Sequence, residues 1–525
     1  SITKKNEKLI YNTFYKKTIQ YAMKFLITSL IFCAIFVNMQ ASTLNLSMSS
    51  SPSRLNPILA NDSASGEISD WLFNGLFKYD KDGNITTEIA SSYTFETPTK
   101  LIVKLKDNVL WHDKEKLSSK DVVFTYEQII SPTVFNSIKS NFSEVASVKA
   151  LDDLTLEIIY KKPYFKALEI WMVGLLPYHI LKDEKNLMTS SFNKNPIGTG
   201  SYKLKEFKTG QDIELIANDD FFEGRPKIDR ILYKFLPDPN TSFLYLKQNK
   251  LDIGSLTPMQ VSRQLDSSFK NNFEILNRPS FGFTYLGFNL ENPKFKDIKV
   301  REALSFAINR QELVDILFFG YGEVCNGPFM PNSFAYNDDV KPITQDLLKA
   351  KALLKEAGYD EKNPLVFEVV TNTGNDIRVN TAQILQYQLS KIGVQMKIRV
   401  MEWQAFLNTV VHPRKFETVL LGWSLALMPD AYPLWHSKSA KLGGFNLVNY
   451  KNEKVDELIE KGSGTINKDE LGAIYKEIFK IVANDLPYLF LYIPDGITAI
   501  NKKIENIDPA FIGIMHNQKD WEIKE

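Results

Sequence analysis

Short strand-like runs alternate with helical segments along this chain, and no fixed internal period relates them. Leu44 to Met48 and Leu101 to Lys106 have the alternating apolar pattern of half-buried strands, and Leu151 to Tyr160 repeats it. Apolar residues at helical spacing occur in Ser69 to Leu76 and again in Val300 to Phe318. Because the two kinds of segment are interleaved rather than grouped, the pattern predicts a mixed α/β fold.

The second half of the chain carries the clearest order of elements. Helical spacing predicts helices at Asp346 to Ala357 and at Thr381 to Ile392, and a glycine ends the second of them. Strands are predicted at Val394 to Val400 and at Thr418 to Trp423. This β-α-β order indicates a separate lobe with a helix-covered sheet, and the last strand, Leu489 to Ile493, is expected to return to the first lobe.

The composition is that of an ordinary globular chain. A length of 525 residues corresponds to about three or four domain equivalents. Hydrophobic residues make up 44% and charged residues 24%, which excludes general disorder. The 63 basic and 62 acidic residues give a net charge of +1, so no chain-wide basic excess exists to neutralise phosphates. We therefore expect no nucleic-acid partner.

Cysteine and histidine are too few and too scattered for an ordinary metal centre. Cys33 and Cys325 cannot form a metal cluster or a disulfide framework. No two histidines stand four residues apart, and none has a cysteine neighbour at zinc-site spacing. The histidines are His112, His179, His412, His436 and His516. We expect no dedicated metal site and no cofactor.

Residues 23–41 have the pattern of a secretory signal peptide. A basic start precedes Phe25 to Val37, a short apolar run that is not long enough to span a bilayer. Cleavage is expected after Ala41, and residues 1–22 are interpreted as an upstream extension. A buried N-terminal helix and an uncleaved anchor are the alternatives.

The two cysteines also indicate the cellular compartment in which the protein works. Cys33 makes lipoprotein processing a further alternative. However, the bulky Phe32 stands directly before Cys33, where lipoprotein processing requires a small residue. After cleavage Cys325 would be the one remaining cysteine, which suits a bacterial periplasm and argues against a disulfide-dependent extracellular module. We expect a periplasmic protein without a lipid anchor.

No catalytic constellation stands out. The chain has no Gly-x-Ser-x-Gly elbow, and no cysteine–histidine signature surrounds Cys325. His112 and His436 lie beside tryptophans, where an imidazole more often completes a polar contact than acts as an acid or base. The two glycines of residues 196–202 precede a strand and lack a Lys-Ser/Thr pair, so a tight turn is favoured over a phosphate loop.

Five groups of segments resemble the extracytoplasmic solute-binding proteins of peptide ABC importers, bacterial family 5. This oligopeptide- and dipeptide-binding family also includes nickel-binding members. The most specific group is Tyr285 to Asn289 followed by Asp297 to Arg310. The other groups are 55–57 with 76–80, 111–113 with 120–126, 196–202 with 218–226, and 422–423, 430, 435–437 and 446–450 with 485–492. Ser201 replaces a proline that is usual in the family.

The resemblance implies a class II, two-lobed periplasmic-binding-protein-like α/β fold of the large peptide-binding type. Lobe I would comprise 42–278 and 485–525, with an extra subdomain inserted at about 58–190, and lobe II would comprise 279–484. A peptide would be enclosed between the lobes and delivered, chemically unchanged, to an inner-membrane ABC permease and its ATPases. The protein would be a monomer and not an enzyme.

The resemblance also directs attention to the segment after the Gly-Trp pair. In peptide-binding relatives an aspartate there receives the amino terminus of the peptide, but here Ala426 stands about where that acid is expected. Asp430 is our candidate for the role, with a surface or capping aspartate as the alternative. Trp423 and Trp403 are the candidate aromatic walls for variable side chains.

Arginines are the candidates for holding a carboxylate. Arg378 and Arg54 can each present a bidentate fork, with a solvated or structural arginine as the alternative. Asn56 is included as a ligand-binding residue beside Arg54. On the same fold, a binder of nickel or another metal chelate would use one histidine such as His436 or His412. An exported hydrolase is the remaining alternative.

Overall fold

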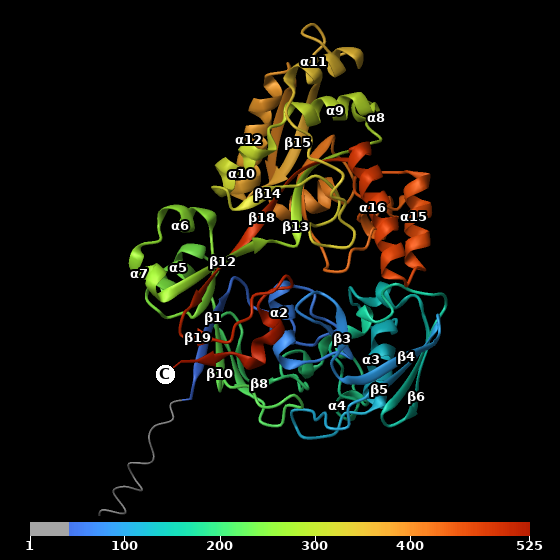
Figure 1. Ribbon diagram of the computed structural model, residues 1–525, viewed down its shortest axis with the longest axis vertical. Coiled ribbons are helices and arrows are strands. Elements are labelled where there is room, and N and C mark those ends of the chain that lie inside the picture. Colours follow the sequence, from blue (N-terminus) through green and yellow to red (C-terminus); the bar gives the residue numbers. More distant parts are fainter. Residues whose placement is uncertain (1–40, 525) are drawn as a thin grey trace, which may run out of the picture. The chain divides into compact units, whose positions relative to one another are not determined.

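Strand β18 (Tyr488–Asn501) connects two groups of strands in the computed structural model, which describes residues 41–524 (Figure 1). Its first half pairs with β13 (Gly282–Phe288) and β14 (Gly322–Val324). Its second half pairs with β11 (Ile253–Leu256) and β12 (Phe273–Pro279). The predicted extension 1–22 and the signal peptide, apart from Ala41, lie outside the described residues.

The strand group that follows β13 contains a β-α-β unit, of whose two strands only the second was predicted. Strands β15 (Val366–Asn372) and β16 (Gln395–Met401) are parallel, and helix α12 (Asp376–Ser390) makes the crossover between them. Such a connection is needed because parallel neighbours cannot be joined by a tight hairpin. Strand β17 (Thr418–Ser424) lies between β13 and β15 and ends at the Gly-Trp pair. The end of β17 therefore positions the segment that the sequence singled out.

Two further sheets are built from the N-terminal half. The first has the order β1-β10-β9-β8, and the second has the order β4-β5-β7-β6. The strands of the first are β1 (Thr43–Met48), β8 (Tyr202–Lys208), β9 (Asp212–Ala217) and β10 (Arg230–Phe235). The strands of the second are β4 (Ala90–Thr97), β5 (Lys100–Leu105), β6 (Val145–Asp152) and β7 (Thr155–Tyr160).

The remaining elements are short strands and helices that cover these sheets. The strands are β2 (Phe77–Tyr79), β3 (Ile85–Thr87), β19 (Ile504–Glu505) and β20 (Glu522–Ile523). The longer helices are α2 (Ser63–Leu72), α3 (Ser119–Ile130), α5 (Pro239–Lys247), α9 (Ile298–Ala307), α10 (Arg310–Phe318), α11 (Leu347–Glu356), α15 (Glu453–Ser463) and α16 (Lys468–Asp485). The shorter helices are α4 (Tyr178–Leu181), α6 (Pro258–Arg263), α7 (Ser267–Asn272), α8 (Pro293–Lys296), α13 (Trp403–Phe406) and α14 (Tyr432–Trp435). The single-turn segments are η1 (Lys139–Phe142), η2 (Glu169–Met172), η3 (Leu187–Thr189), η4 (Ser191–Asn193), η5 (Leu407–Val411), η6 (Ser437–Ser439) and η7 (Met515–Asp520).

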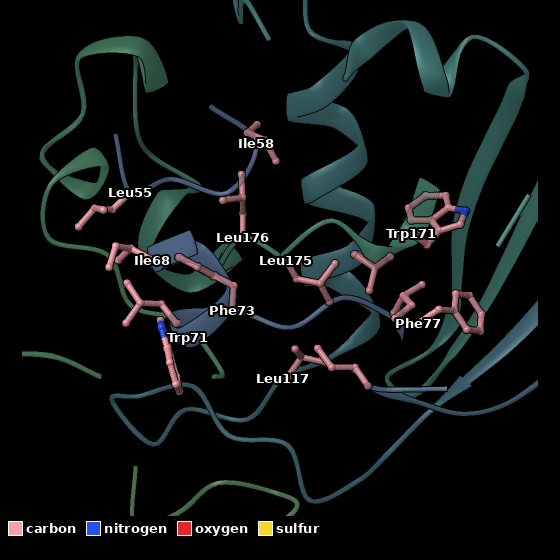
Figure 2. Close-up of a cluster of buried hydrophobic side chains, with 14 of the residues drawn as sticks. Leu55, Ile58, Ile68, Trp71, Phe73, Phe77, Leu117, Trp171, Leu175 and Leu176 are labelled. Atoms are coloured by element: carbon pink, nitrogen blue, oxygen red, sulfur yellow. The ribbon is translucent and has the colours of Figure 1, made fainter. Parts of the chain in front are cut away.

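The glycine turn of residues 196–202 holds helix α2 against strand β8. A Cβ on Gly198 would lie 1.8 Å from the Leu72 carbonyl oxygen, and a Cβ on Gly200 would lie 2.2 Å from that of Trp71. The Gly200 N–H donates to the Leu72 oxygen over 2.8 Å. Only glycine permits this approach, so the turn is structural, as predicted. Figure 2 shows the buried side chains that α2 contributes beside it, among them Ile68 and Trp71.

His112 fixes the same turn from the other side. Its Nδ1 accepts the Gly198 N–H over 3.1 Å, and its Nε2 lies 3.1 Å from the Gly200 carbonyl oxygen, to which it donates. Burial lowers the pKa of His112 to about 4, because the charged ring would be desolvated. The imidazole is therefore neutral and completes a polar contact.

Several predicted boundaries are wrong. Helix α2 ends at Leu72 instead of spanning Ser69 to Leu76, and it begins early because Asp62 caps it by accepting the Ser65 N–H. The segment Leu151 to Tyr160 contains the turn of the β6–β7 hairpin. The helix predicted at Val300 to Phe318 is two helices, since Ile308 is extended and Asn309 caps α10.

Candidate functional site

Two neighbouring cavities draw their walls from segments far apart in the sequence. The first, about 500 Å³ in volume, we call the acidic cavity. Its wall includes Ser69, Asp70, Phe73, Asn74, Lys78, Tyr79, Glu88, Met172, Phe221, Glu223, Phe281, Leu427, Met515, His516, Gln518 and Lys519. The second, about 370 Å³, also contains Tyr79 and Leu427 in its wall, so the two adjoin. Both volumes are in the range of small-molecule sites.

The second cavity is more apolar and draws residues from both predicted lobes. Tyr93, Phe95 and Phe165 come from the predicted lobe I subdomain. Phe334 and Met428 come from predicted lobe II. Aromatic walls of this kind accept varied apolar groups without demanding one shape.

Asp70 brings a carboxylate to the acidic cavity from the last turn of α2. The side chain reaches the solvent of the cavity, yet surrounding protein desolvates its carboxylate. This desolvation, with the nearby charges of Glu88 and Glu67, raises the pKa of Asp70 to about 7. A helix C-terminus further disfavours an anion, so the position is costly for the fold.

Glu88 supplies a second carboxylate to the same cavity. Its oxygens accept hydrogen bonds from Asn74 Nδ2 and from the Gly75 N–H, each at 3.0 Å. Burial nevertheless raises the pKa of Glu88 to about 7, although Lys78 opposes the shift. The cavity is therefore an environment in which two carboxyl groups titrate near neutral pH.

The C-terminal segment closes one side of this cavity. Gln518 Nε2 donates to the backbone oxygen of Asp70 over 3.2 Å, and the Trp521 ring lies edge-on to Trp71 at 6.1 Å. Gln518 Oε1 is buried and has no hydrogen-bond partner among the described residues. His516 also lines the cavity, and its Nε2 lies 2.8 Å from the backbone oxygen of Asp508.

Trp423 and Arg378 form a second cluster at the end of β17. Trp423 stacks on Tyr285 at 6.1 Å, and its Nε1 donates to Tyr488 Oη over 3.2 Å. Arg378 Nη1 donates to Asn372 Oδ1 over 3.0 Å. Across residues 41–524, no carboxylate lies within ion-pair distance of Arg378, and burial lowers its pKa. The cluster thus offers a cation beside aromatic rings.

Asp430 is already paired. Its Oδ2 lies 2.8 Å from Lys166 Nζ, and Lys166 comes from the segment after β7, in the predicted lobe I. The side chains retain 10% and 28% of their accessible surface, for Lys166 and Asp430 respectively, so the pair is largely shielded from water. The neighbouring Ala426 is exposed. The carboxylate expected to receive a ligand amine thus neutralises an internal cation in this structure.

The other predicted site residues are dispersed. Asn56 is fully buried, donates to Asn193 Oδ1 over 3.0 Å and accepts the Ile58 N–H. His436 is 1% exposed, and its ring nitrogens accept the Lys438 N–H and lie 3.3 Å from Glu460. Arg54 is half-buried next to Asn56 in the chain. Trp403, 39% exposed on α13, contacts Phe406. Asn56 and His436 thus have hydrogen-bond partners inside the fold, and their ligand-binding roles stay predictions.

Comparison with known proteins decides the family. Residues 84–444 match the model of the bacterial extracellular solute-binding proteins, family 5 (middle region). This chain belongs to that family. As a member of family 5 it is the two-lobed solute-binding component of an ABC transporter and not an enzyme. The resemblance inferred from the sequence segments is confirmed.

Relatives within family 5 cover nearly the whole chain. The oligopeptide-binding protein AppA of Bacillus subtilis is 33% identical over 489 residues, covering 90% of this chain and 89% of AppA. Its structure in complex with a nonapeptide has a TM-score of 0.78 at 32% identity and covers 92% of this chain and 99% of that one. NikZ from Campylobacter jejuni, solved in complex with Ni(L-His), has a TM-score of 0.78 at 31% identity, covering 91% and 99%.

The residues that line the acidic cavity were not predicted from the sequence. One usable signal was Asp70, an acid placed near the end of a helix, where the helix dipole disfavours it. Glu88 and Gln518 gave no local signal, since each stands in an ordinary polar stretch. Gln518 joins the other two only because the C-terminal segment returns to α2.

Proposed function

We propose that this protein captures peptides between its lobes and delivers them to an inner-membrane ABC permease. The observation that carries the proposal is the 33% identity over 489 residues to an oligopeptide-binding protein. The mixed walls of the two adjoining cavities support it, because a peptide brings charged ends, backbone groups and variable side chains that need different partners. Burial of these groups stabilises the closed form.

The division into lobes belongs to the same proposal. Lobe I is assigned to 42–278 and 485–525, with its subdomain at about 58–190, and lobe II to 279–484. The change of partners along β18 supports two lobes but places their crossing within β18, since β13 and β14 pair with residues 488–494 and β11 and β12 pair with residues 495–501. The protein acts as a periplasmic monomer after cleavage behind Ala41, without a lipid anchor. None of the described helices combines the length and apolar character needed to cross a membrane.

A metal chelate is the second candidate ligand. The similarity to NikZ, solved with Ni(L-His), favours it, together with the position of His516 in the wall of the acidic cavity. His412 is exposed, and His436 is buried among acidic side chains. In residues 41–524, no group of three or more histidine, cysteine, aspartate or glutamate side chains is placed to hold a bare metal ion.

Native mass spectrometry of protein purified without denaturation tests both candidate ligands, the peptide and the metal chelate. A retained mass that fragments as a peptide supports the main proposal. Calorimetry with peptides against nickel plus histidine then compares the two ligand classes on the same preparation. Binding of nickel–histidine without binding of any peptide would replace the main proposal with the second one.

A further inference from the structure

The charges around the acidic cavity leave one carboxylate uncompensated. Lys78 Nζ is paired with Glu223 at 3.1 Å, and Lys519 with Asp520 at 2.9 Å. Glu88 receives two hydrogen bonds from its neighbours. Within residues 41–524, Asp70 makes no side-chain hydrogen bond and no ion pair. The wall therefore presents an unpaired anion to a solvent-filled space.

This anion is held in an unfavourable place. It lies in the last turn of α2, where the helix dipole disfavours a negative charge, and no basic residue occupies that turn. The titratable and charged groups that face it from the surrounding elements are Glu67, Lys78, Glu88, Glu223, His516 and Lys519. Desolvation and the nearby carboxylates raise its pKa to about 7. A bound cation would relieve each of these costs.

A neighbouring acceptor points to the same kind of ligand. Gln518 Oε1 is buried in the cavity wall and accepts no hydrogen bond from the described residues. The amide nitrogen of the same side chain donates to the Asp70 backbone oxygen. An unsatisfied buried acceptor costs about 1–3 kcal/mol unless a donor reaches it. The Gln518 side chain thus lies next to the Asp70 backbone with one acceptor unsatisfied, and a ligand N–H that reached this oxygen would remove that cost.

We propose that Asp70, supported by Glu88 and Gln518, forms a subsite that binds a protonated amine or guanidinium of the ligand. This inference rests on the proposed peptide function, for which it names the recognised group. The group is either the amino terminus of a peptide or a lysine or arginine side chain. The subsite supplies the anionic partner that Ala426 does not, while the Asp430 carboxylate is occupied by Lys166.

The test compares wild type with Asp70→Asn and Asp70→Ser, using Asp183→Asn as the matched control. Asp183 is an exposed carboxylate far along the chain from α2. The first probes are n-butylguanidinium, n-butylammonium and neutral n-butanol, measured by thermal shift and calorimetry. The second probes are randomised short-peptide pools with free or acetylated amino termini, each made with lysine or with norleucine.

Cationic probes should bind wild type and Asp183→Asn alike and lose about 10- to 100-fold in affinity with Asp70→Asn. Neutral probes should be unchanged. A selective loss for free-amine pools assigns the amino terminus, and a selective loss for lysine pools assigns the side chain. Equal binding of cationic probes to wild type and Asp70→Asn, equal losses for neutral probes, or no binding of any cationic probe would overturn the subsite. Asp70-dependent binding of n-butylguanidinium without retention of any peptide pool would instead refute the peptide function.

Discussion

Removing the Lys166–Asp430 ion pair should shift the ligand-free protein toward an open form. The pair joins the segment after β7 to the loop after β17, with a nitrogen–oxygen distance of 2.8 Å. Other contacts join the segment after β7 to helices α15 and α16: the Phe165 N–H donates to the Ser463 oxygen over 3.2 Å, Lys162 Nζ donates to Ser463 Oγ over 3.3 Å, and the Phe165 and Tyr475 rings lie 6.3 Å apart. Of these contacts the Lys166–Asp430 pair is the one that joins two opposite charges, and it is therefore expected to be the most sensitive to perturbation.

Its contribution follows from burial and geometry. Two unit charges at about 4 Å attract by about 4 kcal/mol at an effective dielectric of about 20, before desolvation is subtracted. With 10% and 28% of the side chains exposed, the net value expected is that of a charged hydrogen bond, about 1.5–3 kcal/mol. Lys166→Met should therefore lower the closed-to-open ratio by about 10- to 100-fold.

Single-molecule energy transfer between labels at Leu151→Cys and Leu348→Cys measures this ratio directly. Both positions are exposed, at 55% and 84%, and lie in the predicted lobe I subdomain and lobe II. Cys325 is buried and burial raises its pKa to about 12, so it does not compete for the dyes. Lys182→Met, at an exposed position, is the control. An unchanged distance distribution in Lys166→Met and in Asp430→Asn would refute the reasoning.

Three further outcomes follow from the site and the fold. Because the pKa values of Asp70 and Glu88 are about 7, cationic ligands should bind more tightly as pH rises from about 6 to 8 and should release protons, which calorimetry in two buffers detects. His112, with a folded pKa of about 4 against 6.5 unfolded, should lose about 3 kcal/mol of its contribution to stability as pH falls between these values. Chemical denaturation should show no such dependence for His112→Gln. Arg378→Gln should weaken ligands that carry a free carboxylate more than their amides, while Trp423→Ala should weaken both and leave the protein folded; direct titration and circular dichroism check these changes.

The sequence predicted α12 and the strands β16, β17 and β18 because each depends on a local pattern. Strand β15 was not predicted, and α12 begins at Asp376, where Asn375 caps it, and not at Thr381. Residues 489–493, expected to return to the first lobe, pair with β13 and β14 instead. The break between α9 and α10 was missed because apolar spacing continues through Ile308. A single extended residue interrupts a helix without disturbing the pattern on which the prediction relied.

The ligand-binding residues were harder to predict because polar side chains look alike in sequence. Asn56 and His436 stand in segments that resemble the family, yet their side chains complete hydrogen bonds inside the fold. Asp70 and Gln518 are separated by most of the chain and meet through one hydrogen bond, from the Gln518 side chain to the Asp70 backbone oxygen. Such a pairing depends on how the C-terminal segment packs, which no local pattern records.

The two aspartates show why a charge must be judged by its partners. Asp430 stands near the position that the family resemblance implies for an amine anchor, but Lys166 satisfies it internally at 2.8 Å. A ligand ammonium would have to displace that lysine and leave a largely buried cation without a partner. The free-energy cost of this unpaired cation exceeds the gain from the new ion pair between the ligand and Asp430. Asp70 has no cation to displace, so a ligand amine there adds an interaction without breaking one. On this argument, the anchoring charge moves from the loop after β17 to helix α2, and the Lys166–Asp430 pair is left to hold the lobes together.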